Sequence, residues 1–278
     1  MAIASNIRLA ASLIITLASS FARSPQAQPQ HARVELLALQ SSLKPGSDLQ
    51  LGVHFILEKG WHIYWINPGD SGQPPSFKWQ LPVGFSAGAI QWPRPERMQS
   101  SPEVTDYGYH DEALFMVPIH PRQSIHGEQL RGLRVAVEVK WLVCREVCIP
   151  EHADLELSLP SDAMKGDPAT AKLFADAKKL LPGPMPRSWT VRAESRKNDF
   201  LLTVVPGKPI TKTIFFPLDP GQIDNSAPQK LQPSHSGATL TLKKSDLLLK
   251  PINVLRGVLV IPGGSAYRIE APVRQPIQ

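Results

Sequence analysis

The chain has 278 residues and a formal net charge of +6 at pH 7. Its basic residues are scattered and no nucleic-acid-binding motif accompanies them, so the charge favours solubility and we expect no nucleic-acid partner. The sequence contains neither a glycine-rich βαβ fingerprint nor a Cys-x-x-Cys-His motif. We therefore expect no nicotinamide, flavin or haem cofactor.

Proline is frequent in this sequence, and its distribution indicates the fold class. The 28 prolines are about twice the usual share, and they separate short runs of alternating hydrophobicity. That pattern is typical of an all-β protein with many turns. A mature chain of roughly 250 residues is long enough for one large sandwich or for two smaller domains.

The N-terminus has the pattern of a signal peptide over residues 1–22. Arg8 precedes the apolar stretch Leu9–Ala18, and Ser20–Ala22 suits a signal-peptidase site. The apolar stretch is much shorter than the roughly 20 residues of a membrane-spanning helix, although an uncleaved anchor is an open alternative. No cysteine follows the stretch, so we expect no lipid anchor. The sequence predicts an exported, periplasmic protein whose mature chain begins near Arg23.

Alternating apolar runs predict a first β domain over residues 30–160. In the run at residues 49–58, apolar side chains occupy every second position, which is typical of a strand with one buried face. The run that ends at Cys144 alternates in the same way. The expected strands are Val34–Leu39, Leu49–Glu58, His62–Trp65, Ala113–Ile119, Leu130–Val143 and Ala153–Leu159.

Two aromatic segments of this first domain differ in their expected roles. Residues 60–72 (GWHIYWINPGDSG) hold aromatics beside a glycine-rich turn, and we expect the tryptophans there, and Trp79, in the core. Residues 106–110 (DYGYH) have polar flanks and a glycine, which predict a loop that covers or binds something. Four histidines lack metal-ligand spacing, and we expect them to be packed or on the surface: His54, His62, His110 and His120.

Cys144 and Cys148 are the only cysteines of the chain. Four residues of extended strand span about 13 Å, whereas disulfide-bonded Cα atoms lie within about 7 Å, so the chain must turn between them if they bond. The alternation before Cys144 places it at a strand end on the more polar face, where we expect a partner to reach its thiol. Lys140 and Arg145 favour a thiolate, and Glu146 opposes it.

Three chemistries are open for this cysteine pair. In an oxidising compartment, two close cysteines are usually bonded or redox-active. A disulfide across so small a loop gains only about 2 kcal/mol from unfolded-state entropy, and a domain of this size buries a core without it, so redox activity is favoured over a structural bridge. His152 extends the pattern to Cys-x3-Cys-x3-His, but zinc sites usually need four ligands and shorter cysteine spacing, so we expect no metal site.

The pattern changes after residue 160. Asp167-Pro168 opens a segment with helical spacing, Ala169–Leu181, and prolines follow it. We assign residues 161–188 to a helix and proline-rich linker and residues 189–278 to a second domain. Together the patterns predict an all-β protein with two immunoglobulin-like β-sandwich domains. The second set of expected strands is Trp189–Ala193, Phe200–Val205, Lys212–Phe216, Thr239–Lys243, Val254–Ile261 and Ala266–Ala271.

Several segments resemble a known family. GWHIYWINPGDSG, YGYHDEALFMVPI and WLVCREVCIPE are similar to the N-terminal periplasmic domain of the thiol:disulfide interchange protein DsbD family, in its longer ScsB-like variants. FADAKKLLPGPMPRSW and FFPLDPGQIDNSAPQ resemble the second β domain of those variants. The resemblance therefore extends over nearly the whole mature chain, and the cysteine segment is its most specific part.

The resemblance implies an immunoglobulin-like domain that exchanges electrons through its two cysteines, here Cys144 and Cys148. It implies that Cys144 is shielded and that Cys148 attacks partners, although the best-known members have a longer spacing between the two. It places Tyr64 near the site. The family's aromatic cap loop falls on Asp106, Tyr107, Gly108 and Tyr109.

Full-length members continue into a membrane domain and a thioredoxin-like domain, which this sequence lacks. The resemblance therefore implies a separate membrane-embedded thiol reductase (DsbD/CcdA-like) and thioredoxin-like exported proteins as partners. We predict an exported dithiol/disulfide exchange module of the protein-disulfide reductase type, relaying electrons between them. The alternative is a two-domain binding or adaptor protein in which the cysteine pair forms a structural disulfide or binds copper.

Overall fold

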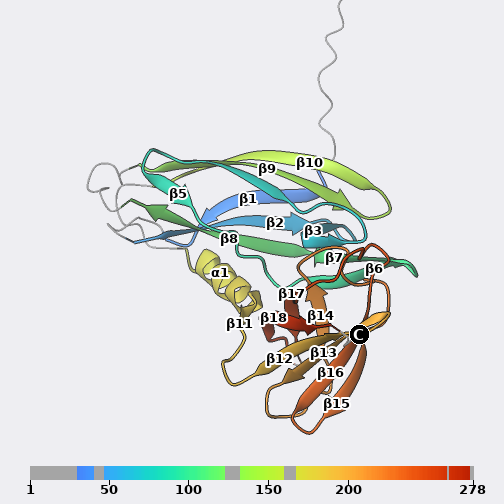
Figure 1. Cartoon of the computed structure of the whole chain (residues 1–278). Helices are drawn as coiled ribbons and strands as arrows, with labels where there is room; N and C mark the ends of the chain where they lie inside the picture. Colours follow the sequence, from blue (N-terminus) through green and yellow to red (C-terminus); the bar gives the residue numbers. More distant parts are fainter. Residues whose placement is uncertain (1–29, 41–46, 123–131, 160–166, 262, 276–278) are drawn as a thin grey trace, which may run out of the picture.

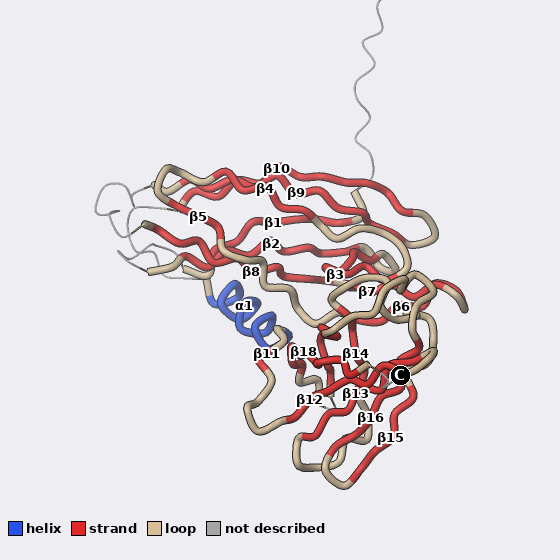
Figure 2. The backbone as a smooth tube through the Cα atoms, viewed as in Figure 1, coloured by secondary structure: helices blue, strands red, loops and turns tan. Residues whose placement is uncertain are grey.

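The computed structural model describes residues 30–40, 47–122, 132–159, 167–261 and 263–275. Two β-sandwich units with a short helix beside them make up these residues (Figures 1 and 2). The predicted all-β class with two immunoglobulin-like sandwiches is confirmed. The predicted signal peptide, residues 1–22, lies outside the described residues, and the predicted domain boundaries stay predictions. In the described ranges no helix is long and apolar enough to cross a membrane.

The first sandwich consists of two antiparallel sheets. One sheet has the strand order β1 (Ala32–Ala38), β2 (Leu49–Leu57), β8 (Glu112–Pro121) and β5 (Phe85–Ala87). The facing sheet has the order β10 (Cys148–Ser158), β9 (Arg134–Cys144), β3 (His62–Gly69), β7 (Val104–His110) and β6 (Glu96–Ser101), and β4 (Ser76–Gln80) also pairs with β9.

The alternating patterns of β2 and β9 fill the core between these sheets. Every second residue of β2 from Leu49 to Leu57 is buried, and β9 buries every second residue from Val135 to Val143. The rings of Phe115 and Trp141 meet Phe55 edge to face, with centroids 5.5 and 5.2 Å away. The strand predicted at residues 49–58 is present as β2, and the one predicted at residues 130–143 is present as β9 from Arg134 onward, with the buried faces that their patterns indicated; residues 130 and 131 lie outside the described residues.

Helix α1 (Pro168–Leu180) lies against the outer face of the first sheet (Figure 1). Asp167 caps it by accepting hydrogen bonds from the backbone amides of Ala169 and Thr170, and Pro168 occupies its first turn. Phe174 packs its ring onto the outer face of the paired strands β2 and β8: a Cβ atom on Gly52 would lie 2.8 Å from the ring's Cζ atom. The predicted helix at residues 169–181 is thus present, and a glycine makes room for its main anchor.

The second sandwich is one continuous path of strands with its own apolar core. Its order is β14 (Ile214–Pro217), β17 (Val254–Val260), β18 (Ala266–Arg274), β12 (Thr190–Ser195), β13 (Asp199–Val205), β16 (Gly237–Lys243) and β15 (Lys230–Ser234), and β11 (Gly183–Pro184) pairs with β18. The path joins its two halves through a short parallel pairing of β12 with β18. The second sandwich therefore folds around a core distinct from that of the first.

The two sandwiches are also packed against each other. Phe216 of β14 is 2% exposed and belongs to the apolar cluster of the first sandwich. Its ring centroid lies 5.3 Å from that of Tyr107 and 6.3 Å from that of Trp65. Asn67 donates a hydrogen bond of 2.7 Å to the carbonyl oxygen of Pro217. The contact is therefore both apolar and specifically hydrogen-bonded, and it lies under the sheet that carries the cysteines.

Replacing Phe174 with Ala should lower the free energy of unfolding by about 3 kcal/mol, because the ring is buried and its removal leaves a cavity between α1 and the sheet. Urea denaturation followed by circular dichroism measures this loss. Lys172→Ala, on the exposed face of the same helix, should change the value by less than about 0.5 kcal/mol. An equal loss in both variants would contradict the packing described for α1.

Candidate functional site

The two cysteines close the end of the β9–β10 hairpin. The two strands pair in one uninterrupted antiparallel register in which Cys148 lies opposite Cys144. The turn between them is closed by a hydrogen bond from the backbone amide of Arg145 to the carbonyl oxygen of Val147. The cysteines are bonded to each other, with Cα atoms 4.1 Å apart. The predicted chain reversal between the cysteines is thus present, and it takes the form of a tight hairpin.

The two sulfur-bearing residues differ sharply in exposure. Cys144 is only 2% exposed, whereas Cys148 is exposed at the start of β10. The expectation that Cys144 is accessible, drawn from strand alternation, is wrong. The edge of the sandwich is closed there by neighbouring groups, among them the side chain of Tyr64. Of the two bonded cysteines, only Cys148 is exposed to solvent.

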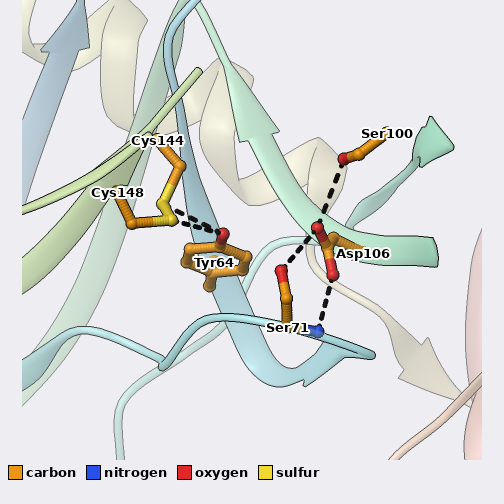
Figure 3. The surroundings of a disulfide bond; sticks show 6 residues. All are labelled: Tyr64, Ser71, Ser100, Asp106, Cys144 and Cys148. Atoms are coloured by element: carbon orange, nitrogen blue, oxygen red, sulfur yellow. Dashed lines mark hydrogen bonds between the residues drawn. A yellow bond between two sulfur atoms is a disulfide. The ribbon is translucent and has the colours of Figure 1, made fainter. Parts of the chain in front are cut away.

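Tyr64 of β3 lies directly behind the disulfide (Figure 3). Its hydroxyl donates a hydrogen bond of 3.0 Å to Cys144 Sγ and lies 3.4 Å from Cys148 Sγ. The side chain is 1% exposed. Burial raises the pKa of Tyr64, although a hydrogen bond with Ser71 opposes the rise, so the phenol keeps its proton and is a donor at neutral pH.

The turn that follows β3 packs against the ring of Tyr64. Gly72 has φ +74°, and a Cβ atom built on it would lie 2.1 Å from Tyr64 Cζ. Only glycine fits this position, because any side chain would collide with the ring and the backbone conformation is left-handed. At Gly69, which has φ +95°, a Cβ atom would lie 2.4 Å from the carbonyl oxygen of Thr105. The glycines of the predicted turn thus allow the backbone to enclose the tyrosine.

Asp106 holds this turn in place (Figure 3). It accepts hydrogen bonds from the backbone amide of Ser71 at 2.8 Å and from its hydroxyl at 2.9 Å. Ser100 Oγ lies 3.4 Å from the same carboxylate. Asp106 is 2% exposed, and these donors compensate for its removal from water. Asp106 therefore acts on the site through Ser71 and the turn.

The segment predicted to form an aromatic cap loop is a strand. Residues 106–109 lie within β7, which pairs with β3 on one side and with β6 on the other. Tyr107 is fully buried and donates to Asn225, and Tyr109 is 5% exposed and donates to the carbonyl oxygen of Pro93. A Cβ atom on Gly108 would lie 2.0 Å from the carbonyl oxygen of Ile63. The glycine marks a close approach of two strands, and the prediction of a loop is wrong.

His62 is a neighbour of the disulfide whose role the sequence did not indicate. It pairs with Cys144 in the β3–β9 ladder and is 7% exposed, with its ring centroid 5.3 Å from that of Tyr64. Burial, assisted by nearby His110, lowers the pKa of His62. The imidazole beside Cys144 is therefore neutral at neutral pH.

A stack of three side chains supports the outer edge of the hairpin. The guanidinium carbon of Arg145 lies 5.1 Å from the ring centroid of Trp61. His31, which directly precedes β1, stacks on the same indole with centroids 3.7 Å apart, and its Nδ1 atom lies 2.7 Å from the carboxylate of Glu58. This arrangement fixes a positive charge at the turn of the hairpin, in the residue that follows Cys144. Trp61 and Trp65 are buried as predicted, and Trp79 is partly buried against the same core.

The Cys-x3-Cys-x3-His pattern does not gather into a ligand set. His152 pairs with Lys140, four residues along β10 from Cys148, a strand distance of about 13 Å. Within the described ranges no group of three or more His, Cys, Asp or Glu side chains is placed to hold a metal ion.

Tyr64→Phe should raise the lower of the two thiol pKa values of the reduced protein by about one unit. The hydroxyl that lies 3.0 Å from Cys144 Sγ stabilises a thiolate, and its loss favours the thiol. The pH dependence of alkylation by a small reagent, followed by mass spectrometry, gives this pKa. Tyr267→Phe, at the far sandwich, is the matched control; an unshifted profile in Tyr64→Phe would mean that the hydroxyl does not tune the pair.

Comparison with known proteins agrees with this geometry. Residues 32–160 match the family model of the N-terminal domain of the thiol:disulfide interchange protein DsbD. The crystal structure of the N-terminal periplasmic domain of ScsB from Proteus mirabilis is similar in fold, with a TM-score of 0.70 and 18% sequence identity over 90% of this chain and 96% of that chain. No curated protein sequence matches the chain.

The chaperone YadV and the periplasmic chaperone SfaE are much weaker structural matches. YadV gives a TM-score of 0.23 at 10% identity over 86% of this chain and 99% of that one, and SfaE gives 0.22 at 10% over 87% and 100%. The ScsB match, by contrast, covers both sandwiches and supports the fold described above. Residues 32–160, which carry the Cys144–Cys148 hairpin, therefore form a DsbD-like N-terminal domain.

Proposed function

We propose that this protein is an exported thiol–disulfide exchange module that carries electrons through Cys144 and Cys148. In this proposal Cys148 is the attacking thiol, Cys144 is the resolving thiol, and Tyr64 positions and polarises the pair. The observation that carries the proposal is the asymmetry of the site. One cysteine is exposed, while the other is 2% exposed and receives a hydrogen bond from a buried tyrosine.

The arrangement suits a two-step exchange. The Cys148 thiolate attacks one sulfur of a partner disulfide; a bond forms between Cys148 and that sulfur, and the partner's other sulfur leaves as a thiolate and is protonated. The Cys144 thiolate then attacks Cys148 Sγ, which forms the Cys144–Cys148 disulfide and releases the partner's second thiol. Two electrons pass to the partner, whose disulfide becomes a dithiol.

The chemical balance of this cycle defines the partners. A single dithiol stores one electron pair, so a second protein must reduce Cys144–Cys148 after each turnover. We assign that role to a membrane-embedded thiol reductase (DsbD/CcdA-like) and the oxidised side to thioredoxin-like exported proteins. The family match of residues 32–160 and the similarity in fold to the periplasmic domain of ScsB support a periplasmic location. The predicted signal peptide at residues 1–22 belongs to the same proposal.

The Cys144→Ser variant, which keeps the exposed thiol, should accumulate mixed disulfides with thioredoxin-like proteins and with a membrane reductase. Exchange passes through a mixed disulfide between the two proteins. Without the thiol of Cys144, no group of this protein can break that bond, so the mixed disulfide accumulates. Non-reducing gels of the cell envelope, with mass spectrometry of the adducts, measure the yield.

Cys148→Ser is the matched control, because it keeps only the buried thiol. It should trap several-fold less protein than Cys144→Ser. If it traps more, the assigned roles of the two cysteines are reversed. If neither variant traps a protein, the exchange function is wrong and a binding module with a structural disulfide takes its place.

A further inference from the structure

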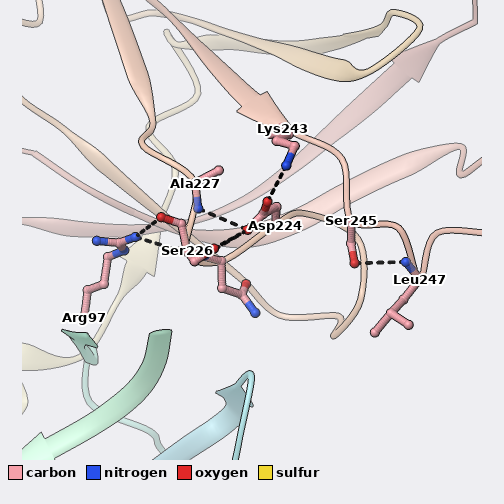
Figure 4. Close-up of polar contacts among 8 residues, drawn as sticks. Arg97, Asp224, Ser226, Ala227, Lys243, Ser245 and Leu247 are labelled. Atoms are coloured by element: carbon pink, nitrogen blue, oxygen red, sulfur yellow. Dashed lines mark hydrogen bonds and ion pairs between the residues drawn. The ribbon is translucent and has the colours of Figure 1, made fainter. Parts of the chain in front are cut away.

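A loop of the second sandwich, residues 224–227, contacts the part of the first sandwich that lies next to the redox site. Residues 224–227 follow β14, and Asp224 ties the loop together by accepting hydrogen bonds from the backbone amides of Ser226 and Ala227, each at 3.1 Å (Figure 4). Its other carboxylate oxygen accepts a bond of 2.8 Å from Lys243 on β16. The loop is therefore a fixed part of the second sandwich.

Arg97 of the first sandwich forms hydrogen bonds with the backbone of this loop. Its Nη2 atom donates to the carbonyl oxygens of Asn225 at 2.8 Å and Ser226 at 3.1 Å (Figure 4). Two bonds from one charged guanidinium to two successive carbonyls set the position of the loop as well as its orientation. The side chain of Asn225 is held between the two sandwiches as a result.

Asn225 is 7% exposed, and both ends of its amide are used. Its Nδ2 atom donates a hydrogen bond of 2.7 Å to Asp70 Oδ1, and its Oδ1 atom accepts one of 3.0 Å from the hydroxyl of Tyr107. Asp70 also accepts a bond of 2.8 Å from the backbone amide of Thr105. Asn225 therefore bonds a residue of the turn that encloses Tyr64.

A second contact fixes the start of the same turn. Asn67 donates to the carbonyl oxygen of Pro217 in the second sandwich at 2.7 Å, and its Oδ1 atom accepts from the backbone amide of Gly69 at 3.2 Å. Residues 67–72 are thus attached to the second sandwich at Asn67 and at Asp70. Directly beyond Asp70 come Ser71, which bonds Asp106, and Gly72, which touches the ring of Tyr64.

We propose that the second sandwich positions the redox site, with Asn225 as the positioning residue that acts on Cys144 and Cys148 through Asp70, the 69–72 turn and Tyr64. The inference deepens the proposed exchange function and rests on it. A contact that only docks the two sandwiches would be satisfied by the apolar packing of Phe216. The buried amide of Asn225 instead donates to Asp70, in the turn whose Gly72 lies against the ring of Tyr64.

The test uses Asn225→Ala in the full-length protein and two readouts. In the oxidised protein, hydrogen exchange of the peptide spanning residues 69–73 should accelerate about fivefold, the effect of one lost hydrogen bond. In the reduced protein, the lower thiol pKa should rise by about half a unit, measured from the pH profile of alkylation, because Tyr64 is held less firmly against the sulfurs. Asn225→Ser serves in the same way if the alanine variant folds poorly.

A double variant shows whether the effect passes through Tyr64. In a Tyr64→Phe background the Asn225 substitution should leave the thiol pKa unchanged, because the hydroxyl that it positions is already gone. Thr239→Ala is the matched control: it removes a hydrogen bond to Thr203 within the second sandwich and should change neither readout.

The outcomes separate the two proposals. Unchanged exchange at residues 69–73, or a pKa shift of equal size in the Tyr64→Phe background, overturns the positioning role and leaves the exchange function standing. If the wild-type disulfide resists reduction in the folded protein, the exchange function fails, and acceleration of hydrogen exchange confined to residues 69–73 then decides whether Asn225 controls the turn.

Discussion

The site depends on the pairing of β9 with β10. An uninterrupted antiparallel register runs from Arg134 opposite Ser158 to Cys144 opposite Cys148, so the position of the disulfide is set by the whole ladder. A slip of β9 by one residue would exchange the buried and exposed faces of that strand and would turn its apolar side chains toward water. The hydrophobic core of the first sandwich therefore specifies the location of the two sulfurs.

The asymmetry between the sulfurs follows from what closes the end of that ladder. β3 runs beside β9 and brings Tyr64 and His62 to the buried cysteine, whereas Cys148 begins the outermost strand of the sheet. A buried phenol with a raised pKa offers a donor to sulfur without offering a charge. Arg145, in the turn between the cysteines, holds its positive charge over the ring of Trp61. The site thus pairs an exposed sulfur-bearing residue with a buried one whose sulfur accepts a hydrogen bond from Tyr64.

The sequence indicated much of this fold but little of the network behind the site. The alternation of β2 and β9 predicted both strands because one face of each is buried. The segment at residues 106–109 was misread because a glycine between polar and aromatic residues is typical of a loop, whereas Gly108 serves a close approach of strands. Short strands such as β5 and β11 carry too few residues to show a period.

The contact of Asn225 with Asp70 joins residues 155 positions apart, and no local pattern reports such a bond. The same is true of Ser71 and Asp106, 35 positions apart. The sequence did show that residues 60–72 combine several aromatic residues with several glycines, more than a strand and its turn require. The structure explains that excess, because these residues enclose the tyrosine behind the disulfide.

The reduction potential of the Cys144–Cys148 pair tests the central claim most directly. It is measured by equilibrating the folded protein in a series of dithiol/disulfide buffers and counting alkylated thiols by mass spectrometry. An exchange site should equilibrate with the buffer and give a potential well above about −300 mV. A value below that level, or a disulfide that stays oxidised in strongly reducing buffer while the protein is folded, would identify a structural bridge and contradict the account.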